Sequence, residues 1–309
     1  MKYISDSSIY QNKFSVVTLG NFDGIHLGHR KLIETVKKES KKRGYQSVVF
    51  SFYPHPQLVI KKNNFQGMIF SRNEKKKKLE NMGIDIYIEY PFTKEFANIS
   101  PEEFVKDILI KQLKTKVIVI GSNNRFGRKQ EGNVQFLKER EKKWGISVIE
   151  ISHVLKDNKI ISSSRIRKEL LNGNIQKVNE LLGSPYVISG NVIEGKKLGR
   201  ILGYPTVNIS SQEERIYPPN GVYITRTKWN NKNFYSVTNI GYNPTVNGKN
   251  KNIETYIIDF NKDIYGEMIE VEFYKWVRKE QKFESIDKLV EQLKKDVNIA
   301  KLYFKNCNN

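Results

Sequence analysis

Apolar and β-branched residues gather in five short runs over the first 160 residues, and stretches with helical spacing follow them. This alternation is typical of a parallel sheet that helices cover on both faces. We therefore expect an α/β domain in this part of the chain. The apolar runs are 16–19, 48–52, 84–88, 117–120 and 148–151, and the helical stretches are about 28–43, 101–112, 132–143 and 163–172.

One of these helices carries a start signal in its sequence. Ser100-Pro101-Glu102-Glu103 has the form of a capping box with proline at the first helical position. Ligands of such sheets bind outside the carboxyl ends of the strands, so the segments that follow the apolar runs are the first places to look for chemistry.

The pattern changes near Leu182-Gly183-Ser184-Pro185, where helical spacing gives way to short alternating runs with frequent turns. Regular short strands separated by glycine and asparagine favour a small antiparallel β-barrel. We expect two domains, 1–183 and 184–309. The runs of the second domain are 186–193, 221–227, 234–240, 253–260 and 269–276, and a helix over about 285–304 closes the chain.

Composition narrows the class of protein. The chain has 309 residues and is 38% hydrophobic, enough for two ordinary domains, and its apolar runs fall short of the ~20 residues of a membrane span. Residues 1–12 are polar and lack the apolar core of a signal peptide. Cys307 is the one cysteine, which excludes a disulfide framework and a cysteine-based metal site. We expect a cytoplasmic protein with no membrane partner.

The formal net charge is +20, and most of it lies in the first part of the chain. Residues 1–183 hold 34 basic and 19 acidic side chains, a net of +15, and residues 184–309 hold 19 and 14, a net of +5. Nucleic-acid binders are basic, so that class stays open. However, the densest run, 75–78, lacks interleaved aromatics for base stacking, and 37–43 falls on a helix as a solvated face. We expect anionic small molecules rather than nucleic acid as partners.

The segment 20–29 is the most informative of the chain. It reads Gly-Asn-Phe-Asp-Gly-Ile-His-Leu-Gly-His and follows the first apolar run directly. Glycines let backbone N–H groups approach an anion, and the helix that follows adds the positive end of its dipole. His26 and His29 share a face of the first helical turn. A glycine turn with two surface histidines is the alternative. We predict a phosphate site formed by Gly20, Asn21, Phe22, Asp23, Gly24, His26 and His29.

Three further segments follow strands or open a helix. Prolines flank His55 on both sides and fix it in an extended or turn geometry at the rim of the sheet. The segment 121–127, with Asn123 and Arg125, ends the fourth strand. Ser162, Ser163 and Arg165 open a helix, and because a basic residue is disfavoured at a helix N-terminus, Arg165 indicates an anion nearby.

These segments resemble the HxGH-type nucleotidylyltransferases, and the Asn-Phe-Asp-Gly ahead of the histidines is similar to the adenylyltransferase half of bacterial FAD synthetase. The resemblance implies a Rossmann-like domain that transfers AMP from ATP to FMN. It implies catalytic roles for His26, His29 and Arg165, with Ser162 and Ser163 also at the ATP phosphates. It implies a flavin pocket with His55, Pro56, Asn123 and Arg125. The chain departs at Asn124, where phenylalanine is usual, and at Ser164, where threonine is usual.

The second domain opens with a glycine-rich stretch, 190–208. Its glycines make a loop that can accommodate an anion without a Walker lysine, with Gly195, Lys196 and Gly199 as candidate phosphate-binding residues. Thr206 and Asn208 are two apart on an extended segment, so they point the same way. Two neutral oxygens on one face can ligate a hard cation that also holds phosphates, and we predict Mg²⁺ there. A glycine-rich hairpin with a polar strand is the alternative.

This stretch resembles riboflavin kinase, whose signature includes Gly-Arg-x-Leu-Gly-Phe-Pro-Thr-Ala-Asn; Tyr204 and Val207 are the differences. The resemblance implies that Glu254 activates the ribityl hydroxyl of riboflavin and that Arg278 lies near the flavin. Together the two halves imply a bifunctional riboflavin kinase and FMN adenylyltransferase that uses ATP and Mg²⁺ and yields FMN and FAD. A nucleotidylyltransferase for another acceptor, with a second domain that only binds flavin, stays open, and the oligomeric state is undetermined.

Overall fold

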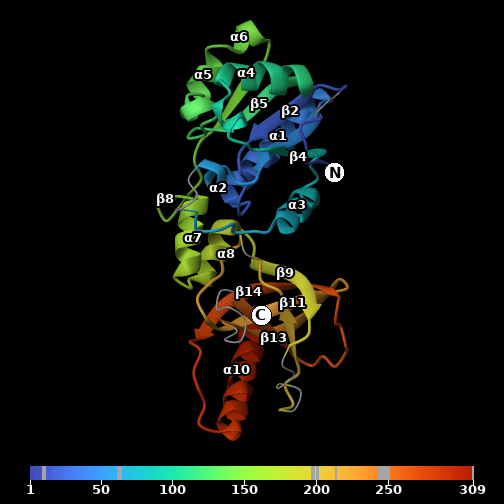
Figure 1. Cartoon of the computed structure of the whole chain (residues 1–309), viewed down its shortest axis with the longest axis vertical. Coiled ribbons are helices and arrows are strands. Elements are labelled where there is room, and N and C mark those ends of the chain that lie inside the picture. The colour runs from blue at the N-terminus through green and yellow to red at the C-terminus, as the bar shows by residue number, and fades with distance from the viewer. Residues whose placement is uncertain are drawn as a thin grey trace. The chain divides into compact units, whose positions relative to one another are not determined.

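The computed structural model describes residues 1–8, 12–60, 65–195, 199, 202–212, 214–242 and 251–307. The chain divides into two compact units. The first unit holds Met1–Gln66 and Arg72–Ser163, and the second holds Gly67–Ser71 and Ser164–Asn309. The labels β2, β4, β5 and α1 in Figure 1 mark the first unit, and β9, β11, β14 and α10 mark the second. A functional boundary at residue 183 stays a prediction.

The first unit is built on a six-stranded sheet whose strand pairs are parallel, as expected. The order is β1-β4-β3-β2-β5-β6. Starting from β2, the chain adds β3 and β4 on one side of the sheet and then β5 and β6 on the other side. The strand order therefore reverses between β2 and β5. The crevice at the carboxyl ends of these two strands is where such sheets bind ligands. The strands are β1 (Lys2–Ile4), β2 (Ser15–Leu19), β3 (Gln46–Tyr53), β4 (Ile86–Pro91), β5 (Thr115–Gly121) and β6 (Ser147–Ile151).

Helices cover both faces of this sheet and give it two apolar cores. On one face α1 (Leu27–Arg43) and α3 (Arg72–Asn81) bury Ile33, Val36 and Leu79 against the strands. On the other, η2 (Phe104–Gln112) and α5 (Val134–Lys138) bury Phe104 and Leu137. The central strands β2 and β3 therefore face apolar neighbours on both sides, which explains why most of their residues are apolar.

The helical expectations need two corrections. The helix expected over 132–143 is two short helices, α5 and α6 (Glu141–Trp144), because Arg140 between them has ψ near 0°. The helix expected over 101–112 begins as α4 (Pro101–Glu103) and continues as the π-type η2. Its capping box is confirmed, since the Glu103 N–H donates to Ser100 Oγ and the Ser100 N–H donates to the Glu103 carboxylate. The remaining elements of this unit are α2 (Pro56–Ile60), η1 (Phe96–Asn98), η3 (Arg128–Gln130), β7 (Leu155–Lys156) and β8 (Lys159–Ile160).

The second unit contains the expected antiparallel barrel, closed in the order β10-β13-β12-β11-β14-β9. Asn230 and Asn231 turn the chain between β11 and β12 with positive φ angles, as a two-residue hairpin requires. The strand expected over 253–260 ends at Ile257, and Asp259 turns away with φ 57°. The strands are β9 (Tyr186–Ile193), β10 (Thr206–Ile209), β11 (Gly221–Trp229), β12 (Lys232–Tyr242), β13 (Lys251–Ile257) and β14 (Met268–Arg278).

Within the described residues, the helices that accompany the barrel are α7 (Ser163–Leu171), α8 (Ile175–Leu182) and α10 (Ile286–Cys307). The long helix α10 packs Ala300 and Phe304 against residues of β11 and β12. In α8, the Asn179 side chain donates to the Phe273 carbonyl and accepts from the Tyr186 N–H. Helix α8 is thus tied to β14 and to the start of β9, although it precedes the expected domain boundary.

Candidate active sites

The segment from Gly20 to His29 connects β2 to α1 at the reversal of strand order. Phe22, Gly24 and Ile25 have φ angles of 50°, 88° and 38°, and the two non-glycine residues are buried. Such backbone is strained for L-residues and is found where a functional site demands it. The buried Phe22 and Ile25 side chains anchor the turn in the apolar core on the α1 face. The glycine–histidine segment is therefore a fixed loop at a sheet crevice.

His26 is the N-cap of helix α1. Its Nδ1 accepts a hydrogen bond from the His29 N–H at 3.3 Å, in the place where a serine or aspartate oxygen usually accepts. Burial lowers the pKa of His26 to about 4, so the ring is neutral near pH 7. Because Nδ1 is an acceptor, the neutral ring carries its proton on Nε2.

The His29 ring is stacked on that of His26, with 3.7 Å between the ring centroids, and Phe22 packs on it at 5.1 Å. Its Nδ1 atom is buried and has no hydrogen-bond partner among the residues that the structure describes. Burial, then His26 and Lys75, hold the pKa of His29 well below its usual value. A buried polar atom without a partner calls for an explanation, and this one lies in the first turn of α1, within the predicted phosphate site.

His55 follows the cis Tyr53–Pro54 peptide bond at the end of β3, and it is buried. Its Nδ1 accepts from the Gln57 N–H, and its Nε2 lies 3.2 Å from Asn21 Nδ2. The structure therefore joins one predicted flavin residue to one predicted phosphate residue. Pro56, the next residue along the chain, begins α2.

The third predicted segment, at the end of β5, reaches the glycine–histidine loop through Asn124. Its Nδ2 donates to the Leu19 carbonyl at 2.7 Å, which closes the end of β2. The residue that departs from the FAD synthetase pattern thus has a backbone partner in this chain. Asn123 and Arg125 are exposed, and Arg125 Nη1 donates to the Asn124 carbonyl. A flavin contact for either residue stays a prediction.

The two predicted serines, Ser162 and Ser163, lie at the start of α7. Ser163 Oγ donates to the Asp23 carbonyl at 2.8 Å and so fixes the glycine–histidine loop from a residue 140 positions away. Ser162 precedes it and is half-buried. Arg165 belongs to the second compact unit, and its predicted role at the ATP phosphates stays a prediction.

The predicted residues of the second site line one cavity of about 450 Å³ between the barrel and α10. Gly195 and Gly199 are among the residues that line it, and larger residues would collide there. A Cβ atom on Gly195 would fall 2.1 Å from Asn208 Nδ2, and one on Gly199 would fall 2.3 Å from the Tyr204 carbonyl. Lys196 lies outside the described residues. Described residues that line the cavity are Gly195, Gly199, Thr206, Asn208, Glu254 and Arg278, among others.

Strand pairing brings the predicted catalytic and metal residues of this cavity together. Asn208 on β10 is directly opposite Glu254 on β13, and Thr206 is opposite Tyr256. Thr206 Oγ1 donates to Glu254 Oε1 at 2.6 Å. The hydroxyl, the amide and the carboxylate are therefore neighbours on one wall of the cavity, where oxygen ligands can meet a hard cation.

Helix α10 forms the opposite wall, and the sequence did not indicate its role. Asp296 is 1% exposed, and Arg278 donates to it from Nε at 3.1 Å and from Nη2 at 2.7 Å. Gln292 Nε2 donates to the same carboxylate. Glu280, a further carboxylate of the cavity, accepts from Asn239 and from another asparagine. An aspartate on the apolar face of the last helix was the one signal that could have revealed the Asp296 pair.

Two family models match different parts of the chain. Residues 8–165 match the family model described as FAD synthetase, and residues 182–304 match the one described as riboflavin kinase. A relative from Buchnera aphidicola subsp. Schizaphis graminum is 42% identical over 95% of each chain, and it is named bifunctional riboflavin kinase/FMN adenylyltransferase. This chain belongs to that family. Relatives of the same name from Bacillus subtilis and Escherichia coli K12 are 37% and 33% identical and cover 94% of this chain.

Membership in the bifunctional riboflavin kinase/FMN adenylyltransferase family confirms the fold class and the two-domain resemblance. A solved structure titled macrolide-efflux protein from Streptococcus pneumoniae superposes with a TM-score of 0.89 at 32% identity, over 97% of this chain and 99% of that one. Among the described residues of this chain, we find no helix that is long and apolar enough to span a bilayer.

Proposed function

We propose that this chain makes flavin cofactors in two ATP-dependent steps. The second unit phosphorylates riboflavin to FMN, and the first unit transfers AMP to FMN, which yields FAD and pyrophosphate. The observation that carries the proposal is the meeting of Thr206, Asn208 and Glu254 in one cavity, within the residues that match riboflavin kinase. The loop that carries His26 and His29 supports the second step, within the residues that match FAD synthetase.

In the kinase step, Glu254 accepts the proton of the ribityl hydroxyl while that oxygen attacks the terminal phosphorus of ATP. The P–O bond to ADP breaks, and ADP leaves with the electron pair. Thr206 donates to one oxygen of the Glu254 carboxylate and so fixes its orientation, while the other oxygen can face the substrate. Glu254 is half-buried, which keeps it within reach of a ligand in the cavity. A positioned base of this kind typically contributes a factor of about 10²–10⁴ in rate.

The donor set of this cavity fits Mg²⁺. A hydroxyl, an amide oxygen and a carboxylate are hard oxygen ligands, and Mg²⁺ is typically held by few protein ligands together with substrate phosphates. Thr206 and Asn208 would hold the ion, as the sequence indicates, with the hydroxyl oxygen of Thr206 still able to accept. When bound, the ion would offset the negative charge of the ATP phosphates.

In the adenylyltransferase step, a phosphate oxygen of FMN attacks the α-phosphorus of ATP, and pyrophosphate leaves. The protein contributes positioning and charge stabilisation at the phosphate oxygens. Neutral His26 can donate from Nε2, because its Nδ1 is occupied by the His29 N–H. The buried Nδ1 of His29 offers a second contact to an oxygen. Arg165, Ser162 and the flavin-pocket residues belong to the proposal in the roles given above.

The test is one incubation of the purified chain with riboflavin, ATP and Mg²⁺, followed by chromatographic separation of FMN and FAD. We expect both products, FMN first, and no product when a chelator removes the divalent cation. A second incubation with FMN and ATP isolates the adenylyl transfer. FMN without FAD in both incubations would show that the first unit has another acceptor, and absence of both FMN and FAD from the first incubation would refute the kinase assignment.

Small anionic substrates account for the basic chain, so we propose no nucleic-acid partner. A filter-binding assay checks this point, since a nucleic-acid partner would show an affinity that falls steeply with salt. A cytoplasmic location is part of the proposal, and cell fractionation tests it.

A further inference from the structure

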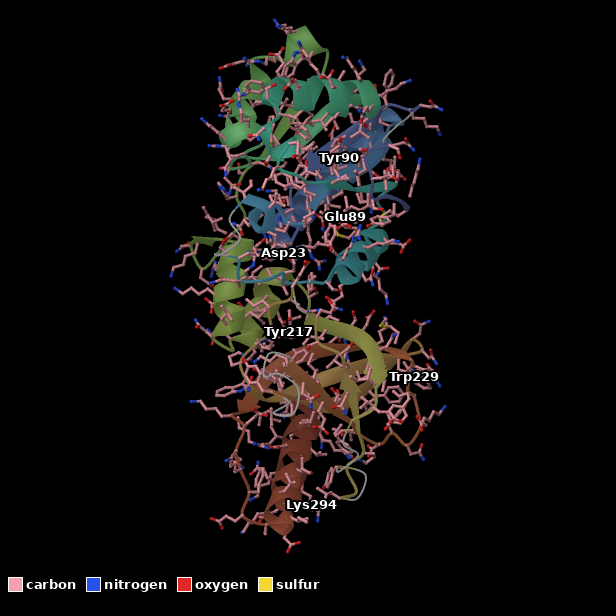
Figure 2. All side chains as sticks on the ribbon, viewed as in Figure 1. Asp23, Glu89, Tyr90, Tyr217, Trp229 and Lys294 are labelled. Carbon is pink, nitrogen blue, oxygen red and sulfur yellow. The ribbon has the colours of Figure 1, made fainter. Side chains whose placement is uncertain are left out.

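A buried ionic cluster lies in the first unit beside the glycine–histidine loop. Its centre is Glu89 on β4, labelled in Figure 2, which is 1% exposed. Lys75 Nζ lies 2.8 Å from Glu89 Oε1, and Arg72 Nε lies 2.5 Å from Oε2. The hydroxyls of Tyr3 and Tyr87 donate to the same carboxylate at 2.6 and 2.5 Å. This carboxylate is therefore paired and hydrogen-bonded at both oxygens.

The charge state of the cluster follows from these contacts. Burial alone would raise the pKa of Glu89, but Lys75 and the tyrosine hydroxyls outweigh it and lower the pKa to about 2. Glu89 is thus ionised at neutral pH, and two cations face it. Lys75 is 2% exposed, which is rare for a lysine, so its charge must be held by the protein rather than by water.

Lys75 also contacts the end of β3. Its Nζ donates to Ser51 Oγ at 3.3 Å, and Ser51 Oγ in turn donates to the Asn21 carbonyl at 3.1 Å. The chain of contacts from Glu89 to Asn21 therefore ends on the backbone of the glycine–histidine loop. The Asn21 side chain continues it to His55.

An ion pair that only stabilised the sheet would not need to reach the loop. Buried pairs cost desolvation and are on average no more stabilising than apolar residues of the same volume. The contact with Ser51 gives this pair a specific role, since the Ser51 hydroxyl in turn fixes the Asn21 carbonyl. The positive charge of Lys75 also acts on His29, where it adds to burial in lowering the pKa of the ring.

We propose that Lys75 is a positioning residue of the adenylyl-transfer site, which Glu89 holds in place and which fixes the Asn21 backbone through Ser51. The inference rests on the proposed function of the first unit. The sequence does not reveal this role, because Lys75 stands in a run of four lysines, 75–78. Its neighbour Lys77 is exposed, whereas Lys75 is buried.

The test compares three variants of the full chain. Lys75→Met/Glu89→Gln removes the pair without leaving an unpaired buried carboxylate, Ser51→Ala keeps the pair and removes the bridge, and Lys77→Met is the matched loss of charge at an exposed position. We expect the double variant to lose about 100-fold in adenylyl-transfer kcat, since small misplacements at a reacting centre cost that much. Ser51→Ala should lose roughly tenfold, and Lys77→Met should equal the wild type. Riboflavin phosphorylation in the same samples is the internal control for intact protein.

A second readout shows whether the charge of Lys75 has been removed at the site without unfolding the first unit. The chain has four histidines, so the ring signals can be followed by NMR across pH, with His29→Gln to assign the signal of His29. In the double variant the His29 signal should begin to titrate at higher pH than in the wild type, and in Ser51→Ala it should not move. Wild-type adenylyl transfer in both Ser51→Ala and the double variant would overturn the inference. Because that titration needs no substrate, a shift in a chain that makes no FAD would refute the proposed function instead.

Discussion

The replacement Glu254→Gln tests the kinase chemistry with the smallest structural change. Glutamine has the same shape, and its side-chain oxygen can still accept from Thr206 Oγ1, which now lies 2.6 Å from Glu254 Oε1. The hydrogen bond becomes a neutral one, which costs about 1 kcal/mol of folding free energy. The substitution therefore removes the basicity of the group and little else.

The expected loss follows from the role of the carboxylate. A general base contributes about 10²–10⁴ in rate, which corresponds to about 2.7–5.5 kcal/mol of activation free energy. This exceeds the folding cost several times over, so the effect on kcat should be far larger than any change in the amount of folded protein. Asn208 and Thr206 remain in place, so the KM for ATP should change less than kcat.

The assay is the initial rate of FMN formation from riboflavin, with FAD formation from supplied FMN measured in the same preparation. Glu270→Gln is the matched control, because it is a glutamate of the same barrel, on β14, outside the residues that line the cavity. A Glu254→Gln enzyme that phosphorylates riboflavin within threefold of the wild type would remove this residue from the mechanism. Loss of both activities would point to misfolding and not to chemistry.

Three further outcomes are expected. His29→Ala should lower FAD formation by about 10²–10³ with riboflavin phosphorylation unchanged, as measured by chromatography, because it removes a contact to a charged transition state. Acidification from pH 6.5 to 4 should destabilise the first unit by about 3 kcal/mol through His26, since the folded state with its pKa of about 4 binds the proton less well than the unfolded chain; in urea titrations, His26→Asn should keep the helix cap and remove the His26 part of that pH dependence, while His29, whose pKa is also lowered, keeps its own part. A fragment of residues 164–309 should unfold at a higher temperature than one of 184–309, because it retains the Asn179 hydrogen bonds and the apolar face of α8; equal melting temperatures would show that α8 contributes nothing.

Much of the fold could be predicted from periodicity because the elements concerned bury whole faces. Strands β2 and β3 are largely buried and mostly apolar since both faces of the sheet are covered, and β13 and β14 alternate in burial because one face of the barrel wall is more exposed. The elements that were missed lack such a signal. Helix α3 is rich in lysine and has little apolar face, and β1 is only three residues long. The division of 132–143 into two helices depends on a single backbone angle at Arg140.

The site was predictable where a motif compresses it into a few neighbouring residues. The loop from Gly20 to His29 and the stretch that contains Thr206 and Asn208 are of this kind. The residues that these segments contact come from other strands. Glu254 lies beside Thr206 only because of the register of β10 against β13. A strand glutamate has no local feature that distinguishes it from a solvated one.

Buried charge was the part that sequence patterns hid. Lys75 stands in a run of four lysines, and Asp296 stands on a helix with many exposed charges, yet both are almost fully buried. Each pairs with a residue of another element, Lys75 with Glu89 and Asp296 with Arg278, and each pair lies beside one predicted site. A buried ion pair is hard to justify by stability alone, because apolar residues would serve as well. The two pairs instead hold side chains or backbone at a fixed position, which is the requirement that phosphoryl and adenylyl transfer place on a protein that forms no covalent intermediate.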